Sequence, residues 1–282
     1  MLRSALILVV LIHLTTWSVA DYVDPQMGGG QVGQGLAPMK HADIAFDGQN
    51  VFVHLDASVG IPRLRPLENP DEFDLTTPAG VLGTKAYNYQ YGWNAGGFLV
   101  VPPGSWIWIE QLEASPELEV YQRPPASPAY APIFGTDAVP MRWRWSGSMT
   151  HNVYAVQDPF QSTYEALYRV YIGNDRTGEP LPQYGSDEVL FTFTASMWGD
   201  FDDNGEYDCE DINALTSQIA IASADLSFDL DRDGGVSRLD LDAWLMLAGK
   251  HNYDQTGGFP YLPADSNLDG RVDDLHLNAW QS

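Results

Sequence analysis

One acidic pattern occurs three times in the last third of this sequence, and it constrains the fold more than any other feature. The first copy runs from Asp200 to Asp211, the second from Asp229 to Asp240 and the third from Asp265 to His276. Every copy has Asp or Asn at its first, third and fifth positions and Gly at its sixth. Carboxylates placed this close together repel one another, so the chain can fold here only if something offsets their charge.

A divalent cation is the compensation that this spacing predicts. Calcium takes about six to eight oxygen ligands, and a loop of about twelve residues supplies them from positions one, three, five, seven, nine and twelve. Position seven contributes its backbone carbonyl, and glycine at position six permits the sharp turn. The predicted Ca²⁺ ligands are Asp200, Asp202, Asn204, Glu206, Asp208 and Asp211 in the first loop, Asp229, Asp231, Asp233, Gly235, Ser237 and Asp240 in the second, and Asp265, Asn267, Asp269, Arg271 and Asp273 in the third.

The third loop departs from the pattern at its last position. His276 stands where a carboxylate would close the coordination shell, and imidazole is a poor ligand for a hard cation. Only six residues follow His276, so a helix after this loop would be short. Calcium binding is therefore predicted for the first two loops, and the third loop stays an open alternative.

The first two loops each precede a segment with helical apolar spacing, over Ile212–Ile221 and Leu239–Leu247. Units of a loop followed by a helix, with Asp at position twelve, resemble the type I dockerin repeat, whose loops are of the EF-hand kind. The resemblance covers Gly199–Ile221 and Phe228–Gly249, and Ala264–Trp280 is similar to a partial third unit. It implies a small all-α module that binds Ca²⁺ and docks onto a partner, such as a cohesin-like or another cell-surface protein.

The loops differ from those of cellulosomal dockerins at positions ten and eleven. Cellulosomal dockerins often carry hydroxyl residues there, which recognise cohesin, whereas this chain has Cys209 and Glu210 in one loop and Arg238 and Leu239 in the other. The sequence around the loops is more similar to the dockerin-like tails of secreted bacterial proteins with β-rich N-terminal regions. The resemblance implies an exported calcium-binding module, with polysaccharide breakdown as one setting, and no catalytic chemistry.

The region before the loops has the period of β-strands. Residues 44–53 are predicted to form two strands around an Asp-Gly turn, and further strands are predicted at 106–109, 141–145, 152–156, 167–172 and 189–194. Short strands rich in β-branched and aromatic residues predict an antiparallel, jelly-roll-like β-sandwich. The proline-bearing segments 61–78 and 123–140 are predicted to be long loops.

The first twenty residues have the layout of a secretory signal peptide. Arg3 precedes the apolar run Ala5–Leu14, and small residues end the segment at Ser18–Ala20. The predicted architecture is therefore multidomain: a signal peptide (1–20), a β-sandwich domain (21–197) and a dockerin-like calcium module (198–282). The mature chain holds no apolar run of membrane-spanning length, so it is expected to be secreted, extracellular or attached to the cell surface.

The charge of the chain limits its partners. It carries 38 acidic and 14 basic residues, for a formal net charge of −24, and residues 199–282 hold 18 of the acidic and 4 of the basic ones. Nucleic-acid binding needs a basic surface, so no nucleic-acid partner is predicted. Cys209 is the only cysteine, which excludes an internal disulfide, and we interpret it as an inert thiol.

No catalytic constellation is recognisable in the sandwich segment, and the protein is predicted not to be an enzyme. Its histidines His41, His54 and His151 lack the close spacing of a cupin-type metal site, so we interpret them as structural or solvent-facing. The glutamates between Glu110 and Glu119 are interpreted as a solvated strand edge rather than as the carboxylate pair of a glycosidase.

The tryptophans of the sandwich segment leave a second interpretation open. Trp106 and Trp108, like Trp143 and Trp145, alternate along one strand, and we predict that all four fill the core. Exposed aromatic rings would instead stack on sugars. Two alternatives to an assembly role therefore remain: a carbohydrate-binding protein that acts through the sandwich, and a polysaccharide-degrading enzyme with an unrecognised site.

Overall fold

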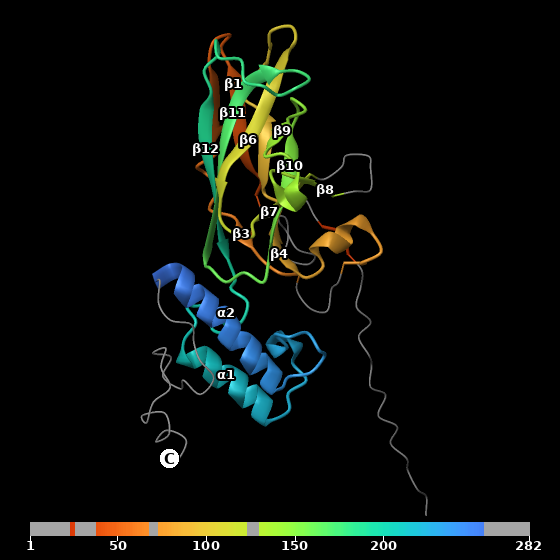
Figure 1. The fold of residues 1–282 in the computed structure, drawn as a ribbon, viewed down its shortest axis with the longest axis vertical. Helices are drawn as coiled ribbons and strands as arrows, with labels where there is room; N and C mark the ends of the chain where they lie inside the picture. The colour runs from red at the N-terminus through yellow and green to blue at the C-terminus, as the bar shows by residue number, and fades with distance from the viewer. Residues whose placement is uncertain (1–22, 26–37, 68–72, 123–129, 257–282) are drawn as a thin grey trace, which may run out of the picture.

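The protein folds into two β-sheets followed by a pair of α-helices, as the computed structural model in Figure 1 shows. The structure describes residues 23–25, 38–67, 73–122 and 130–256. The predicted signal peptide (1–20) and the third acidic loop, with Asp265, Asn267, Asp269, Arg271 and Asp273, lie outside the described residues.

The first sheet contains seven of the described strands. They are β1 (Lys40–Phe46), β2 (Val51–Leu55), β4 (Lys85–Asn88), β5 (Tyr91–Ala95), β7 (Glu119–Gln122), β8 (Ala131–Ile133) and β10 (Thr150–Gln157). Their order is β2-β1-β5-β10-β7-β8, and β4 also pairs with β10. The predicted hairpin at 44–53 is confirmed: β1 and β2 pair antiparallel around a turn in which Asp47 Oδ1 accepts N–H bonds from Gln49 and Asn50.

The second sheet contains five of the described strands. They are β3 (Arg63–Leu64), β6 (Ser105–Ala114), β9 (Arg142–Arg144), β11 (Thr163–Asn174) and β12 (Asp187–Ala195), in the order β3-β12-β11-β6-β9. Each strand predicted from alternation in this part of the chain is present. β11 is long because its inward positions are apolar from end to end, and it pairs along most of its length with both β6 and β12.

The main core lies between the two sheets, which gives the sandwich-like arrangement predicted from the sequence. Inward residues of β5 and β10, such as Trp93 and Tyr154, pack in one cluster with inward residues of β11 and β12, such as Tyr168 and Phe191. The Trp93 and Phe191 rings stack with centroids 4.8 Å apart. A second cluster covers the opposite face of the seven-stranded sheet, where the segment around the 3₁₀ helix Pro78–Leu82 packs on Tyr87, Tyr89 and Val153 among others.

Two details of the predicted sandwich are wrong. The sheets are not wholly antiparallel, because β1 pairs parallel with β5 and β3 pairs parallel with β12. The proline-bearing segments are not entirely loops, because the first contains β3 and the second contains β8. The parallel pairs join segments that are distant in the sequence, so no local pattern indicates them, and β3 and β8 are only two and three residues long.

The core assignment of Trp106 and Trp108 is also wrong, whereas Trp143 and Trp145 are buried as predicted. On β6 the inward residues are Ile107 and Ile109, and the two tryptophans are half-buried on the outer face.

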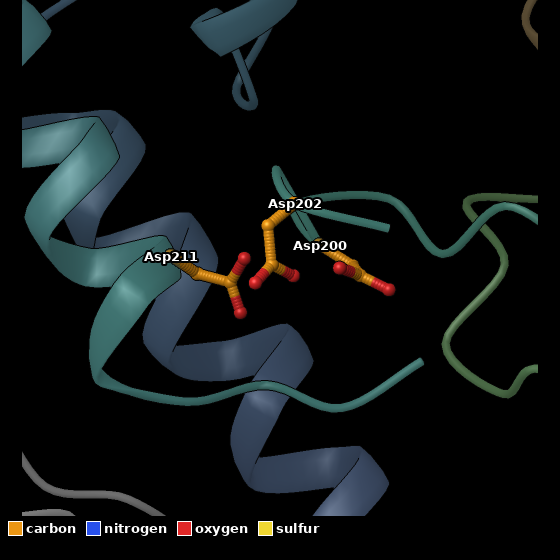
Figure 2. Close-up of side chains that lie close together, drawn as sticks. All are labelled: Asp200, Asp202 and Asp211. Carbon is orange, nitrogen blue, oxygen red and sulfur yellow. The ribbon is translucent and has the colours of Figure 1, made fainter. Parts of the chain in front are cut away.

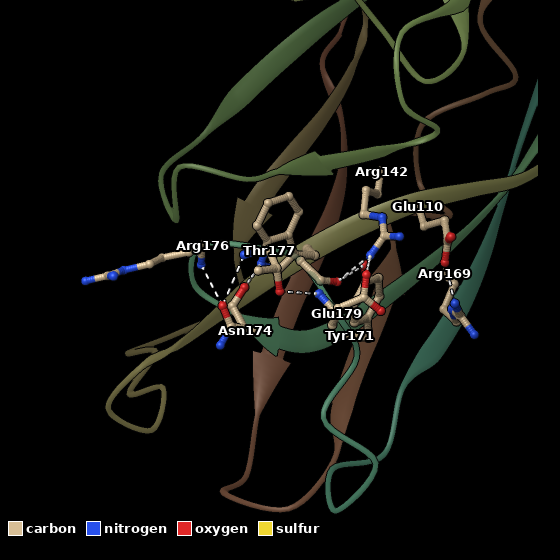
Figure 3. A network of polar contacts seen from close by, with 10 residues as sticks. Glu110, Arg142, Arg169, Tyr171, Asn174, Arg176, Thr177 and Glu179 are labelled. Carbon is tan, nitrogen blue, oxygen red and sulfur yellow. Dashed lines mark hydrogen bonds and ion pairs between the residues drawn. The ribbon is translucent and has the colours of Figure 1, made fainter.

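The protein's own side chains and turns contact these outer-face rings. The Arg144 guanidinium lies 4.6 Å from the Trp106 ring centroid, and the turn at Gly178 lies against the Trp108 ring. Beside them, Figure 3 shows Arg169 paired with Glu110, and Arg142 paired with Glu179 at 3.1 Å. This face of the five-stranded sheet is therefore covered by a polar network.

The two helices follow β12 and pack against each other (Figure 1). α1 spans Cys209–Ala220 and α2 spans Arg238–Thr256, so both predicted helices are present and α2 is longer than predicted. They bury a small cluster centred on Leu215, Trp244 and Ala248. Among the described residues, no helix is long and apolar enough to cross a membrane.

Candidate metal centre

The first acidic loop gathers three of its predicted ligands. Asp200, Asp202 and Asp211 each place a carboxylate oxygen within 4.8 Å of the other two (Figure 2). Asp200 and Asp202 belong to the loop, whereas Asp211 lies in the first turn of α1. The twelve-residue spacing therefore brings the first, third and last ligand positions to one point.

The backbone of this loop wraps around its first aspartate. Asp200 accepts N–H bonds from Asn204 at 3.1 Å and from Gly205 at 2.8 Å. The wrapping requires left-handed backbone at Asp203, with φ of 57°, and at Gly205, with φ of 86°. Glycine adopts this conformation without steric cost, which explains its place at position six.

The last ligand position also joins the loop to the helix. The Asp211 side chain is fully buried and accepts N–H bonds from Phe201 at 2.7 Å and from Asp208 at 3.0 Å. Asp208 in turn caps α1 by accepting the N–H of Glu210 at 2.9 Å. This reciprocal capping box fixes the loop on the helix N-terminus before any cation is considered.

The second loop repeats the geometry of the first. Asp229, the first residue, accepts N–H bonds from Asp233 and Gly234, and φ is positive at Arg232 and Gly234. Asp240, at position twelve, is fully buried and accepts N–H bonds at 2.6 Å from the loop backbone at positions two and nine. Two loops that share the acidic positions and the glycine at position six thus adopt similar backbone conformations.

The two loops differ in which carboxylates are drawn together. In the second loop the group within 4.8 Å consists of Asp229, Asp231 and Asp233, and it does not include Asp240. In the first loop Asn204 occupies the position of Asp233 and donates amide N–H bonds to Asp202 and Asp208. Of the other predicted ligands, the Ser237 hydroxyl accepts the Leu239 N–H at 3.0 Å, and the Glu206 and Gly235 N–H groups bond to the side chain at position five.

Three carboxyl groups of the loops, those of Asp200, Asp211 and Asp231, are held in an environment that disfavours their charge. Burial raises the pKa of Asp211 to about 6, with the charges of Asp200 and Asp208 adding to the effect. Burial also raises the pKa of Asp200. The pKa of Asp231 is raised by desolvation and by the charges of neighbouring carboxylates such as Asp233. A bound cation would reverse this cost, and an all-oxygen donor set fits a hard cation such as Ca²⁺ better than a soft one.

The residue at position four of each loop contacts the sandwich. The sequence does not indicate this contact. Asp203 of the first loop forms an ion pair with Arg63 of β3. Arg232 of the second loop forms an ion pair with Asp158, directly after β10. The acidic loops therefore lie at the contact between the helices and the sheets.

The glutamates between Glu110 and Glu119 do not form a pair of facing carboxylates like that of a glycosidase. Glu110, Glu117 and Glu119 each pair with a cation, from Arg169, Lys250 and Lys85 respectively, and Glu113 is exposed.

The histidines give a different result. His41 and His151 lie together, with ring centroids 5.3 Å apart, while His54 is exposed on β2. The sequence spacing, more than a hundred residues between His41 and His151, gives no indication of this contact.

Comparison with protein-family models, with curated proteins and with solved structures found no match for this chain.

Proposed function

We propose that this chain is an exported calcium-binding protein, in which a dockerin-type module with two EF-hand-like loops attaches a jelly-roll-like β-sandwich to another protein. The observation that carries the proposal is the repetition of one loop geometry at two sites. In each, the first carboxylate is wrapped by the following backbone and the last is buried at the start of a helix. A chance acidic turn has no reason to recur with the same contacts.

Calcium would be held in the first loop by Asp200, Asp202 and Asp211, and in the second by Asp229, Asp231 and Asp233. The ion would supply positive charge at the point where the carboxylates converge, and so offset both their repulsion and the burial of the last ligand. Since the helices share only a small core, the binding energy of the ion would become folding energy of the module.

The role that follows is assembly or surface attachment rather than catalysis. Loop positions ten and eleven are exposed in both loops, at Cys209 and Glu210 and at Arg238 and Leu239. These positions are free to contact a partner, and their side chains, one thiol, two charged groups and one leucine rather than hydroxyls, favour a cell-surface partner other than the cohesin of cellulosomes. Polysaccharide breakdown is the setting that the dockerin resemblance suggests.

The first test is a calcium titration of the full chain by calorimetry, with one exposed ligand removed from each loop. Asp202→Ala and Asp231→Ala should each abolish one of two binding events, because both side chains belong to a carboxylate group but not to the buried capping network. Asp242→Ala is the matched control: it removes the same charge from an exposed position on α2, outside either loop, and should leave both events intact.

Equal calcium binding by all four proteins, or none by the wild type, would contradict the metal assignment. The partner is tested separately by passing the calcium-loaded chain over an immobilised cohesin domain and over intact bacterial cell envelopes. Calcium-dependent retention on either surface supports an attachment role, and retention that survives a chelator contradicts it.

A further inference from the structure

Two histidines from distant parts of the chain meet on the outer face of the seven-stranded sheet. In the strand order β1-β5-β10, Gly92 pairs with His41 on one side and with His151 on the other, so the three residues form one row across the sheet. The absence of a side chain at position 92 is what lets the imidazoles meet. A Cβ there would lie 2.5 Å from Cε1 and Nε2 of His151.

Three nitrogens of the two rings have no hydrogen-bond partner in the part of the chain that the structure describes. The His151 side chain is 4% exposed, and neither Nδ1 nor Nε2 has a hydrogen-bond partner among the described residues. Within the described part of the chain, Nε2 of His41 is likewise buried without a partner. Buried polar atoms are almost always hydrogen-bonded, because leaving one unpaired costs on the order of 1–3 kcal/mol. Three such nitrogens at one point indicate a missing ligand.

The relative position of the rings fits a shared metal ion. Imidazole binds Zn²⁺ at about 2.0–2.1 Å, so two imidazoles on one tetrahedral ion have ring centroids roughly 5 Å apart. The observed separation is 5.3 Å, and the ring planes make an angle of 66°. Burial, with a smaller contribution from His41, lowers the pKa of His151 to about 4, and the nearby backbone of residues 89–91 opposes part of this shift without forming a well-placed hydrogen bond to either nitrogen. The ring is therefore neutral near pH 7, the form in which imidazole binds metals.

We propose that His41 and His151 form a binding site for a divalent transition-metal ion of borderline softness, Zn²⁺ or Cu²⁺. Among the described residues no third His, Cys, Asp or Glu completes a cluster with them, so water or an added small ligand fills the other positions. Access is from the side of His41, which as a residue is only partly buried although its Nε2 is enclosed. This site differs in kind from the acidic loops, because nitrogen donors select borderline ions and carboxylates select hard ones.

The test is a Zn²⁺ titration of the untagged full chain by calorimetry, in calcium high enough to fill the acidic loops, repeated with Cu²⁺ by electron paramagnetic resonance. We expect one equivalent of either ion, and a copper spectrum with hyperfine coupling to two nitrogens. His41→Gln and His151→Gln should each weaken binding by at least ~100-fold. Loss of a residue that only hydrogen-bonds to a metal ligand can already cost about 100-fold, and loss of a direct ligand should cost no less. His54→Gln, an exposed histidine on the same sheet, is the matched control and should bind as wild type does.

Several outcomes would overturn the proposal. They are an absence of zinc and copper binding in saturating calcium, a copper spectrum with oxygen ligands only, or a loss of affinity in His54→Gln equal to that in the other two variants. His151→Gln changes a buried position, so its fold is checked by near-ultraviolet circular dichroism. If that variant does not fold, His41→Gln and the nitrogen coupling in the wild-type spectrum decide the question, since His41 is partly exposed.

Discussion

The sandwich and the helical module reach a folded state by different means. Among the described residues, the main cluster of the sandwich contains 26 buried residues, with aromatic rings from both sheets interdigitated, and a further cluster covers its outer side. The cluster that the described part of the module buries contains seven. Burial of apolar surface grows with the size of a domain, so the sandwich can be stable alone while the module is marginal.

Charge makes the contrast sharper. Residues 199–282 carry 18 acidic side chains against 4 basic ones, and two groups of three carboxylates have oxygens within 4.8 Å of one another, with Asp200, Asp211 and Asp229 partly or fully buried. The loop backbone is already organised around these carboxylates by N–H bonds, but hydrogen bonds do not neutralise them. A region with a small core and closely clustered negative charge should therefore depend on a ligand, and a region with a large apolar core should not. The predictions below test that difference.

The largest effect is expected from removing one tryptophan from each region. Trp244 in the module and Trp145 in the sandwich are both fully buried, and each donates its indole N–H to a backbone carbonyl at 2.9 Å. Replacement of either by Ala should cost about 3–5 kcal/mol. Trp244→Ala should abolish the helical circular dichroism signal, because the loss exceeds the free energy of unfolding expected of a module with so small a core. Trp145→Ala should lower the melting temperature of the sandwich, which should still fold.

Equal consequences for the two variants would break the comparison. A folded module in Trp244→Ala would mean that its stability does not come from the cluster around Leu215 and Trp244. Loss of the whole fold in Trp145→Ala would mean that the sandwich is as marginal as the module.

Calcium removal should act on one region only. A ligand at about 1,000 times its dissociation constant stabilises the folded state by about 4 kcal/mol, which is comparable to the entire stability expected of the module. Hydrogen exchange with a chelator should therefore show loss of protection in α1 and α2 and unchanged protection in β6 and β11. Protection that changes equally in all four elements, or in none, would contradict ligand-dependent folding of the module.

The sandwich has a pH dependence of its own through His151. Its pKa of about 4 lies below the ordinary value of 6.5, so between these values the unfolded chain binds a proton that the folded chain does not. Stability contributed by the neutral ring is therefore complete above pH 6.5 and falls as the pH drops toward 4, by about 3 kcal/mol in total.

The measurement is denaturant unfolding of the sandwich at pH 7 and pH 4, in calcium and without transition metals. His151→Gln should remove most of the wild-type difference, because glutamine does not titrate. The exposed His54→Gln should retain the difference in full. A wild-type slope that persists in His151→Gln would assign the pH dependence to other groups.

Local patterns explain which parts of the fold can be predicted from the sequence. The hairpin around Asp47 and the start of α1 at Asp208 are specified within a few residues, by a turn with glycine and by a capping box. The conformation of the acidic loops is equally local. These features are recognisable because the residues that make the contacts are neighbours in the chain.

Features that depend on distant strands could not be predicted. On β6 both alternating sets, Trp106 with Trp108 and Ile107 with Ile109, are apolar, so the period identifies a strand but not its inward side. The parallel pairing of β1 with β5 and the row that joins His41 to His151 depend on strand order, which no spacing reveals. The exchange of Asp240 for Asp233 in the second carboxylate group likewise depends on side-chain orientation rather than on loop position.

The smallest expected effect concerns the contact between the two regions. Arg63 pairs with Asp203 and Arg232 pairs with Asp158, and each pair joins position four of an acidic loop to the base of the sandwich. Exposed ion pairs contribute about 0.2–1 kcal/mol and are screened by salt. A double-mutant cycle with Arg63→Gln and Asp203→Asn should therefore give a coupling within this range at low ionic strength, and less in high salt.

The cycle also tests whether the contact between the helical module and the sandwich depends on calcium. If the loops hold the module against the sandwich and the module unfolds without calcium, the coupling should be present with calcium and absent with a chelator, since unfolding would release Asp203 from its left-handed conformation in the wrapped loop. The same cycle on Arg142 and Glu179, a pair within the sandwich, should give a coupling that calcium does not change. A calcium-independent coupling at Arg63 and Asp203 would show that the loop holds its shape, and its place on the sandwich, without the ion.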